Sequence, residues 1–212
     1  MQHGKPFAVD GTNVQPDTRE GEAGHERRLG AHIVSYTADL MICCKGSAEQ
    51  ALLAMRSTMA RLKLTVNDEK IHVCRVPEQY FDFMGYQFAR FHSFPTGRAY
   101  LGTRPSKKSV KRLIKSIHEQ TAYRTSLLEA EELVECLNRK LQGWANYFKL
   151  RPVSKVYRLA DQYTTNRLRR WLCHKHKVRS VGYSLYPSEY RYETLGLVQL
   201  PTLTRNLPWA TA

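Results

Sequence analysis

The chain has 212 residues, a net charge of +14 and 42% hydrophobic residues, which predicts a folded protein of one or two domains and excludes an intrinsically disordered one. No apolar run reaches the ~18 residues of a membrane span, no signal peptide opens the chain, and the cysteines lack Cys-x-x-Cys spacing. We therefore expect a soluble, cytoplasmic protein with a polyanionic partner, without membrane association, disulfides or structural zinc.

The first 31 residues are rich in glycine and in polar and charged residues, without a sustained period of 2 or 3.6. This composition favours a flexible N-terminal tail over residues 1–31. The alternative for Phe7-Ala8-Val9-Asp10 is a short strand that would bring a metal-binding aspartate. Four residues before a glycine are too few to predict a strand, so we expect a flexible tail.

Two apolar runs flank a polar centre between Ile33 and Cys44, which predicts a β-hairpin with Tyr36 to Asp39 at its tip. Hard divalent ions choose oxygen ligands, and two-metal phosphoryl transfer needs several aspartate oxygens around the ions. Asp39 is therefore a candidate catalytic and metal-binding residue. The alternative is that Asp39 is only a polar residue of the hairpin tip.

The segment after this hairpin predicts one helix and further strands. Ser47 resembles the start of a capping box, and apolar residues follow at spacings of 3 or 4: Ala48, Leu52, Met55, Met59 and Leu62. Short extended pieces follow at 64–67 and 71–74. Aromatics then alternate around Gly85, which predicts a strand whose backbone is approached closely, and Pro95-Thr96-Gly97 predicts a turn into another strand.

From residue 104 to 180 the pattern is helical and basic, with 19 Lys and Arg against 6 Asp and Glu, so this block carries +13. Ser106 predicts an N-cap before the apolar stripe Val110, Leu113, Ile114 and Ile117. A capping box at Ser126 predicts a second helix with the stripe Leu133, Leu137, Leu141, Trp144 and Phe148, in which Gly143 suggests close packing against a neighbouring backbone. A third helix opens at Ser154, with Val156, Leu159 and Tyr163 inward.

Basic residues occupy the remaining faces of these helices. The candidate RNA-binding residues are Lys107, Lys108, Lys111, Arg112, Lys115, Arg167, Arg169, Arg170 and Lys175. A solvated face is the alternative for one helix, but three basic helices favour a nucleic-acid surface. Residues 181–212, rich in Tyr and Pro, predict an irregular segment whose rings either stack on bases or lie on the helices.

Several of these segments together resemble the C-terminal half of a bacterial group II intron reverse transcriptase, the intron-encoded maturase. The hairpin at 33–44 is similar to motif C, usually Tyr-x-Asp-Asp, with Ala38 on the first Asp and Asp39 on the second. Phe83-Met84-Gly85-Tyr86 resembles the primer grip. Pro105 to Val110 and Leu141 to Phe148 resemble the maturase-specific thumb, called domain X.

The resemblance implies an α+β fold in which a partial reverse-transcriptase palm, made of β-hairpins and one helix at 32–103, precedes an α-helical thumb at 104–180. In that family it implies RNA-directed DNA synthesis with Mg²⁺, and binding of the parent intron RNA so that it folds and splices. The fingers and the other palm Asp are missing and Ala38 replaces the first motif C Asp, so we expect Mg²⁺ not to be bound productively. Lys63 stands where the family usually has Gly at a helix end, which predicts a left-handed Lys.

Three hypotheses follow. The favoured one is an RNA-binding fragment whose partner is a group II intron or another structured RNA, which assists folding and splicing without polymerase activity alone. The enzymatic alternative is the C-terminal part of an RNA-directed DNA polymerase that engages an RNA/DNA duplex and is completed by a separate chain with fingers and the remaining palm. The third is a decayed fragment that folds around the thumb without a selected role.

Overall fold

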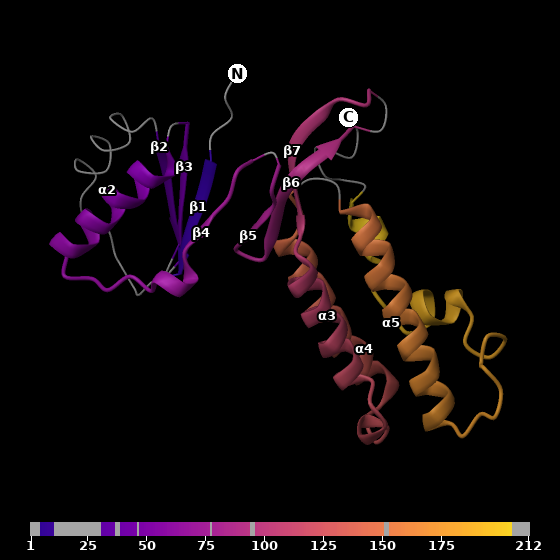
Figure 1. The fold of residues 1–212 in the computed structure, drawn as a ribbon. Coiled ribbons are helices and arrows are strands. Elements are labelled where there is room, and N and C mark those ends of the chain that lie inside the picture. Colours follow the sequence, from indigo (N-terminus) through magenta and orange to yellow (C-terminus); the bar gives the residue numbers. More distant parts are fainter. Residues whose placement is uncertain are drawn as a thin grey trace. The chain divides into compact units, whose positions relative to one another are not determined.

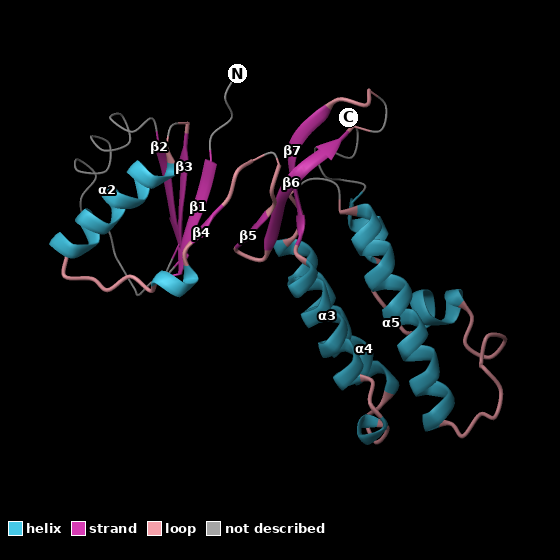
Figure 2. Ribbon diagram, viewed as in Figure 1, coloured by secondary structure: helices cyan, strands magenta, loops and turns pink. Residues whose placement is uncertain are grey.

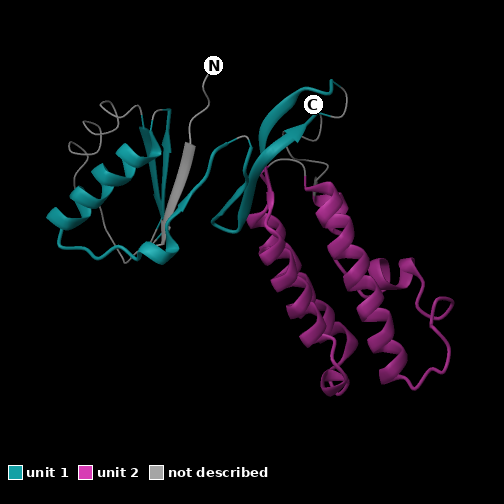
Figure 3. Cartoon of the chain, in the orientation of Figure 1, with its two compact units in different colours: residues 1–102 teal, residues 103–212 magenta. Residues whose placement is uncertain are grey.

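The structure is a computed structural model that describes residues 5–10, 31–36, 39–45, 47–76, 78–93, 96–150 and 153–204. The chain divides into two compact units, residues 1–102 and 103–212 (Figure 3). The first contains small sheets and one long helix, and the second is helical (Figure 2). This confirms sheets followed by helices, whereas the identity of the first unit as a palm remains a prediction.

The first sheet of unit 1 has the strand order β2-β3-β1-β4 (Figure 1). Its strands are β1 Lys5–Asp10, β2 Ala31–Tyr36, β3 Asp39–Cys44 and β4 His72–Val73. β2 and β3 form the expected antiparallel hairpin, with Ile33 opposite Ile42 and Tyr36 opposite Asp39. β1 lies antiparallel on the other edge of β3, so that Asp10 is opposite Asp39.

Strand β1 corrects the flexible-tail prediction for residues 5–10 alone and confirms the alternative of a short strand at Phe7 to Asp10. Residues 5–10 are paired with β3 on one side and with β4 on the other. The tail was predicted from local periodicity. Local periodicity does not reveal the pairing of a short strand with strands that lie far along the chain, as β3 and β4 do here. Residues 1–4 and 11–30 of that segment lie outside the described residues.

Helix α2, Ala48–Arg61, packs against the first sheet. The Oγ of Ser47 accepts a hydrogen bond from the Gln50 N–H at 3.4 Å, which confirms Ser47 as the N-cap. A buried cluster joins the helix to β3: Ile42, Cys44, Ala48, Ala51 and Met55. The predicted amphipathic helix is therefore confirmed, and it supplies half of the core of this sheet.

Helix α2 ends at a left-handed lysine. Lys63 has a φ of 56°. Its N–H donates to the Ala60 carbonyl at 3.0 Å, and the Leu64 N–H donates to the Met59 carbonyl at 2.9 Å. This pair of hydrogen bonds usually ends helices at glycine, because an L side chain is strained at positive φ. The left-handed conformation predicted for Lys63 is confirmed.

The second sheet has the order β5-β6-β7, with β5 Phe81–Phe83, β6 Tyr86–His92 and β7 Ala99–Pro105. Met84 and Gly85 have φ of 50° and 76° and join Phe83 to Tyr86, which face each other in register. A two-residue hairpin turn of this kind requires positive φ at both positions. The prediction that Gly85 lies inside a strand is therefore wrong, since it lies in the turn between two strands.

Unit 2 is built from α3 Lys107–Gln120, α4 Ala130–Tyr147 and α5 Ser154–Lys175 around one core. The Ser109 N–H donates to the Ser106 Oγ at 3.2 Å, which confirms the predicted N-cap of α3. Buried residues of the three helices form that core: Leu113, Ile117, Leu133, Val134, Leu137, Leu141, Ala145, Tyr157, Ala160, Leu168, Trp171 and Leu172. No helix among the described residues combines the length and apolar character needed to cross a membrane.

The start of α4 differs from the prediction. Glu129, and not Ser126, is the residue before the helix, and the Glu129 N–H donates to the Glu132 carboxylate at 3.3 Å. Ser126 instead follows a short helical turn, Tyr123–Thr125. Ser126 and Glu129 each have a Glu three residues later, as in a capping box. The apolar stripe of the helix does not distinguish between these two starting points.

The inward face of α5 also differs. Tyr157, Ala160 and Leu168 are buried, whereas Leu159 is half exposed, at 52%. Apolar and basic residues alternate closely along this helix, so its periodicity defines no single stripe. Contacts with α3 and α4 select the buried face.

Residues beyond 180 belong to the helical unit. Tyr186, Leu195, Leu197 and Leu200 are part of its core cluster, and short helical turns form at Tyr190–Thr194 and Leu200–Thr204. Residues on both sides of the predicted boundary at 180 thus contribute to one core, and the boundary itself stays a prediction. The alternative that the tyrosine rings lie on the helices is confirmed for Tyr186.

Two polar side chains of the helices hold this C-terminal segment. Asn138 of α4 donates from Nδ2 to the Gly196 carbonyl at 2.8 Å and accepts the Val198 N–H at 2.7 Å. Asp161 of α5 accepts the Tyr192 hydroxyl at 2.7 Å and the Leu200 N–H at 3.1 Å. Backbone groups of an irregular segment need such partners, because no regular ladder satisfies them.

Candidate nucleic-acid interface

The outer face of α3 carries a row of exposed cations. We call this row the α3 basic face, and it consists of Lys107, Lys108, Lys111, Arg112 and Lys115. The opposite side of the helix buries Leu113 and Ile117, so the cations are held toward solvent by the packing of the helix. Lys115 pairs with Glu119 at 3.9 Å. Exposed pairs of this kind are weak, so this face is suited to binding a polyanion.

The predicted RNA-binding residues of α5 do not all face solvent. Arg167 donates from NH2 to the Thr121 carbonyl at 2.7 Å and from Nε to the Thr121 Oγ1 at 2.9 Å. The same guanidinium reaches the His118 carbonyl at 3.4 Å. Carbonyls at a helix C-terminus lack partners within the helix, and Arg167 satisfies them at the end of α3. Its role is to join α5 to α3.

Arg169 is a clear correction to the predicted RNA-binding set. It is only 4% exposed, and its guanidinium carbon lies 3.7 Å from the centre of the Tyr183 ring. A buried residue cannot present its charge to RNA phosphates. The pattern missed this because an arginine stem packs on apolar surface as readily as it reaches solvent.

A second buried arginine, Arg191, lies in the same region. It donates to the Thr165 carbonyl at 3.2 Å and to the Ser188 Oγ at 3.0 Å. Burial, followed by the charge of Arg169, lowers its pKa. Among the described residues, neither Arg169 nor Arg191 has a hydrogen-bond partner for its Nε.

Lys175 is also mostly buried, with 17% of its side chain exposed. Its Nζ donates to the Leu128 carbonyl at 2.7 Å and lies 3.4 Å from the Glu129 carboxylate. These contacts join the end of α5 to the loop before α4, which corrects the prediction that Lys175 is an outward RNA ligand. Arg170, in contrast, is exposed as predicted.

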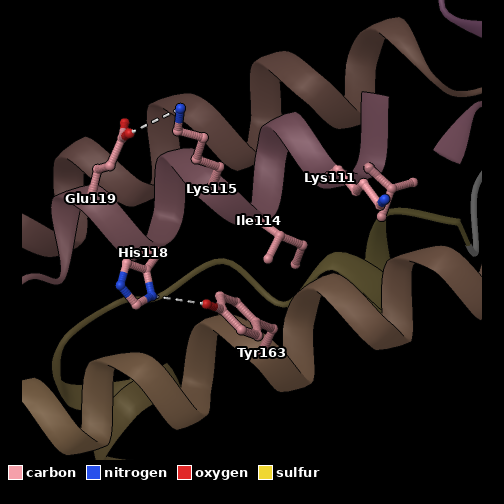
Figure 4. A pocket seen from close by; sticks show the side chains of 7 residues that line it. Lys111, Ile114, Lys115, His118, Glu119 and Tyr163 are labelled. Carbon is pink, nitrogen blue, oxygen red and sulfur yellow. Dashed lines mark hydrogen bonds and ion pairs between the residues drawn. The ribbon is translucent and has the colours of Figure 1, made fainter. Parts of the chain in front are cut away.

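A groove of about 370 Å³ lies beside the α3 basic face (Figure 4). Its lining residues come from α3 and α5: Val110, Lys111, Ile114, Lys115, His118, Glu119 and Tyr163. The His118 Nδ1 and the Tyr163 hydroxyl are 3.2 Å apart. Val110 and Ile114 are half-buried here, although the sequence pattern predicted them as core, and the groove itself was not predicted. The only sequence signal for it is apolar residues next to cations.

The hairpin that carries Asp39 contains one described candidate metal ligand at its tip. Asp39 begins β3, opposite Asp10, and Ala38 lies outside the described residues. Within the part of the chain that the structure describes, no three His, Cys, Asp or Glu residues gather as a metal site. The described residues therefore do not supply the ligand set that two-metal catalysis requires, and we derive no step through Mg²⁺.

The four residues that resemble the primer grip form a single hairpin. Phe83 and Tyr86 are buried and pair across it, and Met84 and Gly85 make its turn. The structure thus brings the four residues together. Their role as a primer grip stays a prediction.

A helical unit with an exposed basic face beside an aromatic-lined groove is typical of a nucleic-acid-binding domain. Residues 109–185, which cover most of α3 and all of α4 and α5, match the family described as group II intron, maturase-specific domain. This segment of the chain is therefore a group II intron maturase-specific domain, which confirms the resemblance of the thumb region to domain X. A comparison with curated proteins found no match.

Proposed function

We propose that this chain binds a group II intron RNA through the α3 basic face and assists its folding and splicing, without polymerising DNA by itself. The maturase-specific domain supports an intron RNA as the partner. The observation that carries the proposal is the row of five exposed cations on α3, a helix that belongs for the most part to that domain.

The expected chemistry of this surface is phosphate binding. Lysine and arginine that neutralise phosphates release condensed counterions, so the logarithm of affinity falls by roughly 0.7 to 0.9 per log unit of salt for each phosphate contacted. Phosphate contacts position RNA and carry little sequence information. RNA selectivity must therefore come from shape or from contacts to bases.

The test is a salt titration of RNA affinity by fluorescence anisotropy, using a labelled group II intron RNA. The variant replaces Lys107, Lys108, Lys111 and Arg112 together with Gln, which leaves Leu113 and Ile117 in the core. A matched control replaces four exposed cations of unit 1 with Gln: Lys45, Arg61, Lys63 and Arg75. Both variants lose the same charge, so their comparison separates a local surface from the charge of the whole chain.

We expect the α3 variant to bind all RNAs more weakly and with a flatter salt slope, and the control to retain most of the affinity. Equal losses in the two variants would attribute binding to net charge. No association of the folded wild-type chain at micromolar concentration and near-physiological salt would reject the proposal.

A second candidate function is the C-terminal part of an RNA-directed DNA polymerase completed by another chain. The observation that favours it is the register of the first sheet, in which Asp10 on β1 faces Asp39 on β3. Two Asp residues are therefore opposite each other in the strand register, and a partner chain would have to add further metal ligands.

Primer extension separates the two candidates. For the purified chain with Mg²⁺ or Mn²⁺ we expect no product above a buffer control. Extension that disappears in Asp39→Ala would favour the polymerase and reject the absence of activity that we propose.

A further inference from the structure

We infer that the groove beside α3 holds one unpaired nucleobase of the bound RNA, with an adjacent phosphate at Lys111. This inference rests on the proposed RNA-binding function and adds to it a site for base contact. The residues involved come from both α3 and α5, so the site exists only when the two helices are packed together.

The size and the apolar floor of the groove fit a single base. Its volume of about 370 Å³ is near the lower end of small-molecule sites and is far too small for a duplex. Val110 and Ile114 are apolar lining residues from α3. Tyr163 points toward Ile114 from α5 (Figure 4). Bases stack on aromatic rings beside cations whatever their sequence.

The polar groups at the edge of the groove match the edge of a base. The imidazole of His118 and the hydroxyl of Tyr163, 3.2 Å apart, can each donate or accept a hydrogen bond. The carboxylate of Glu119, which also lines the groove, adds an acceptor for an exocyclic amine. A base presents both donors and acceptors, so this mixed edge suits it.

The charge around the groove also favours RNA. Lys111 lines the groove and belongs to the α3 basic face, so phosphates bound along α3 would continue past the groove entrance. A nucleotide turned out of a helix places its base into such a groove while its phosphates remain on the cations. An acidic peptide is the competing occupant, but the carboxylate of Glu119 on the rim disfavours it.

The experiment compares two labelled RNA hairpins that differ by one unpaired 5-iodouridine bulge. With the wild-type full chain we expect the bulged RNA to bind about 5- to 150-fold more tightly, which corresponds to base stacking on an aromatic ring. Ultraviolet irradiation of the complex should crosslink the iodouridine to the peptide containing Tyr163 or to that containing His118.

Two matched variants place the effect in the groove. Ile114→Trp fills the groove and should bring the affinity ratio of bulged to paired RNA to about 1. Leu159→Trp adds the same indole at an exposed position of α5 that does not line the groove and should keep the ratio. Circular dichroism checks that both variants are folded.

Equal wild-type affinities for the two RNAs, or crosslinks mapped only outside the groove, would overturn the inference even if Ile114→Trp does not fold. A labelled poly-glutamate peptide that binds the wild type and is lost in Ile114→Trp would assign the groove to a protein partner and would also overturn it. Failure of the proposed function is distinguishable, because then neither hairpin binds.

Discussion

The guanidinium of Arg169 stacks over the ring of Tyr183, with 3.7 Å between the guanidinium carbon and the ring centre. Arg169 lies in α5 and Tyr183 lies in the irregular segment that follows this helix. The contact therefore joins the helix to that segment. Gly182 beside the ring is buried with a φ of 72°. The arginine therefore acts as a structural residue inside a basic domain.

Replacement of Arg169 should affect stability, while replacement of its neighbour should affect RNA binding. We expect Arg169→Ala to lower the free energy of unfolding by about 1–3 kcal/mol, because a cation–π contact and a packed stem are lost. Arg170→Ala should change it by less than about 0.5 kcal/mol, since that side chain is exposed. Urea unfolding and anisotropy measure the two effects. A folded Arg169→Ala that loses RNA affinity more than Arg170→Ala would contradict this assignment.

Gly143→Ala should stabilise the chain by about 1 kcal/mol, because glycine in a helix interior is worse than alanine by that amount. A Cβ at Gly143 would meet nothing within 4 Å, so the close packing predicted from sequence is wrong.

Gly182→Ala is the matched contrast. A Cβ there would lie 2.2 Å from the Cys173 Sγ, at a φ of 72°, so we expect a loss of unfolding free energy. Thermal unfolding of the two variants should shift in opposite directions, and shifts of the same sign would disprove the comparison.

Lys63→Gly should stabilise the end of α2 by about 1 kcal/mol, since glycine adopts the observed φ of 56° without the strain of a Cβ. Arg61→Gly, at the last residue of the helix, should instead destabilise the chain, since glycine is a poorer helix former than arginine. Chemical denaturation of both variants checks the sign. A destabilising Lys63→Gly would show that the lysine side chain makes contacts that outweigh the strain.

Alkaline pH should weaken the attachment of the C-terminal segment. Burial, together with the hydrogen bond to Asp161 and its charge, raises the pKa of Tyr192. A raised folded-state pKa means that this stabilisation is complete below the ordinary tyrosine pKa of about 10 and is lost as pH rises above it. Stability measured between pH 8 and pH 11 should therefore fall at the alkaline end.

Tyr192→Phe tests the source of this pH dependence. At neutral pH the variant should lose about 1 kcal/mol with the hydrogen bond, and its alkaline loss should be smaller than that of the wild type. Burial also raises the pKa of Tyr186, so part of the alkaline loss should persist. Identical pH profiles of stability for wild type and variant would show that Tyr192 is not the source of the alkaline loss.

The candidate site shows where sequence patterns are sufficient. The cations of α3 were predicted correctly as exposed, because an apolar stripe at helical spacing leaves the other face to solvent whatever the helix packs against. Ser106, Ser47 and Lys63 were also placed correctly, since caps and helix ends depend on the backbone of a few adjacent residues. The match of residues 109–185 to the maturase-specific domain agrees with those local signals.

Local sequence patterns did not predict the groove, the burial of Arg169 or the strand β1. Each depends on a partner that is distant along the chain: Tyr163 for the groove, Tyr183 for Arg169, and β3 for β1. The sequence by itself determined which residues are apolar, which are charged and which segments of unit 2 form its three long helices. Only the tertiary structure decided which charges are buried and which apolar residues stay open to a ligand, because burial is set by packing between segments and not by the local period of a helix.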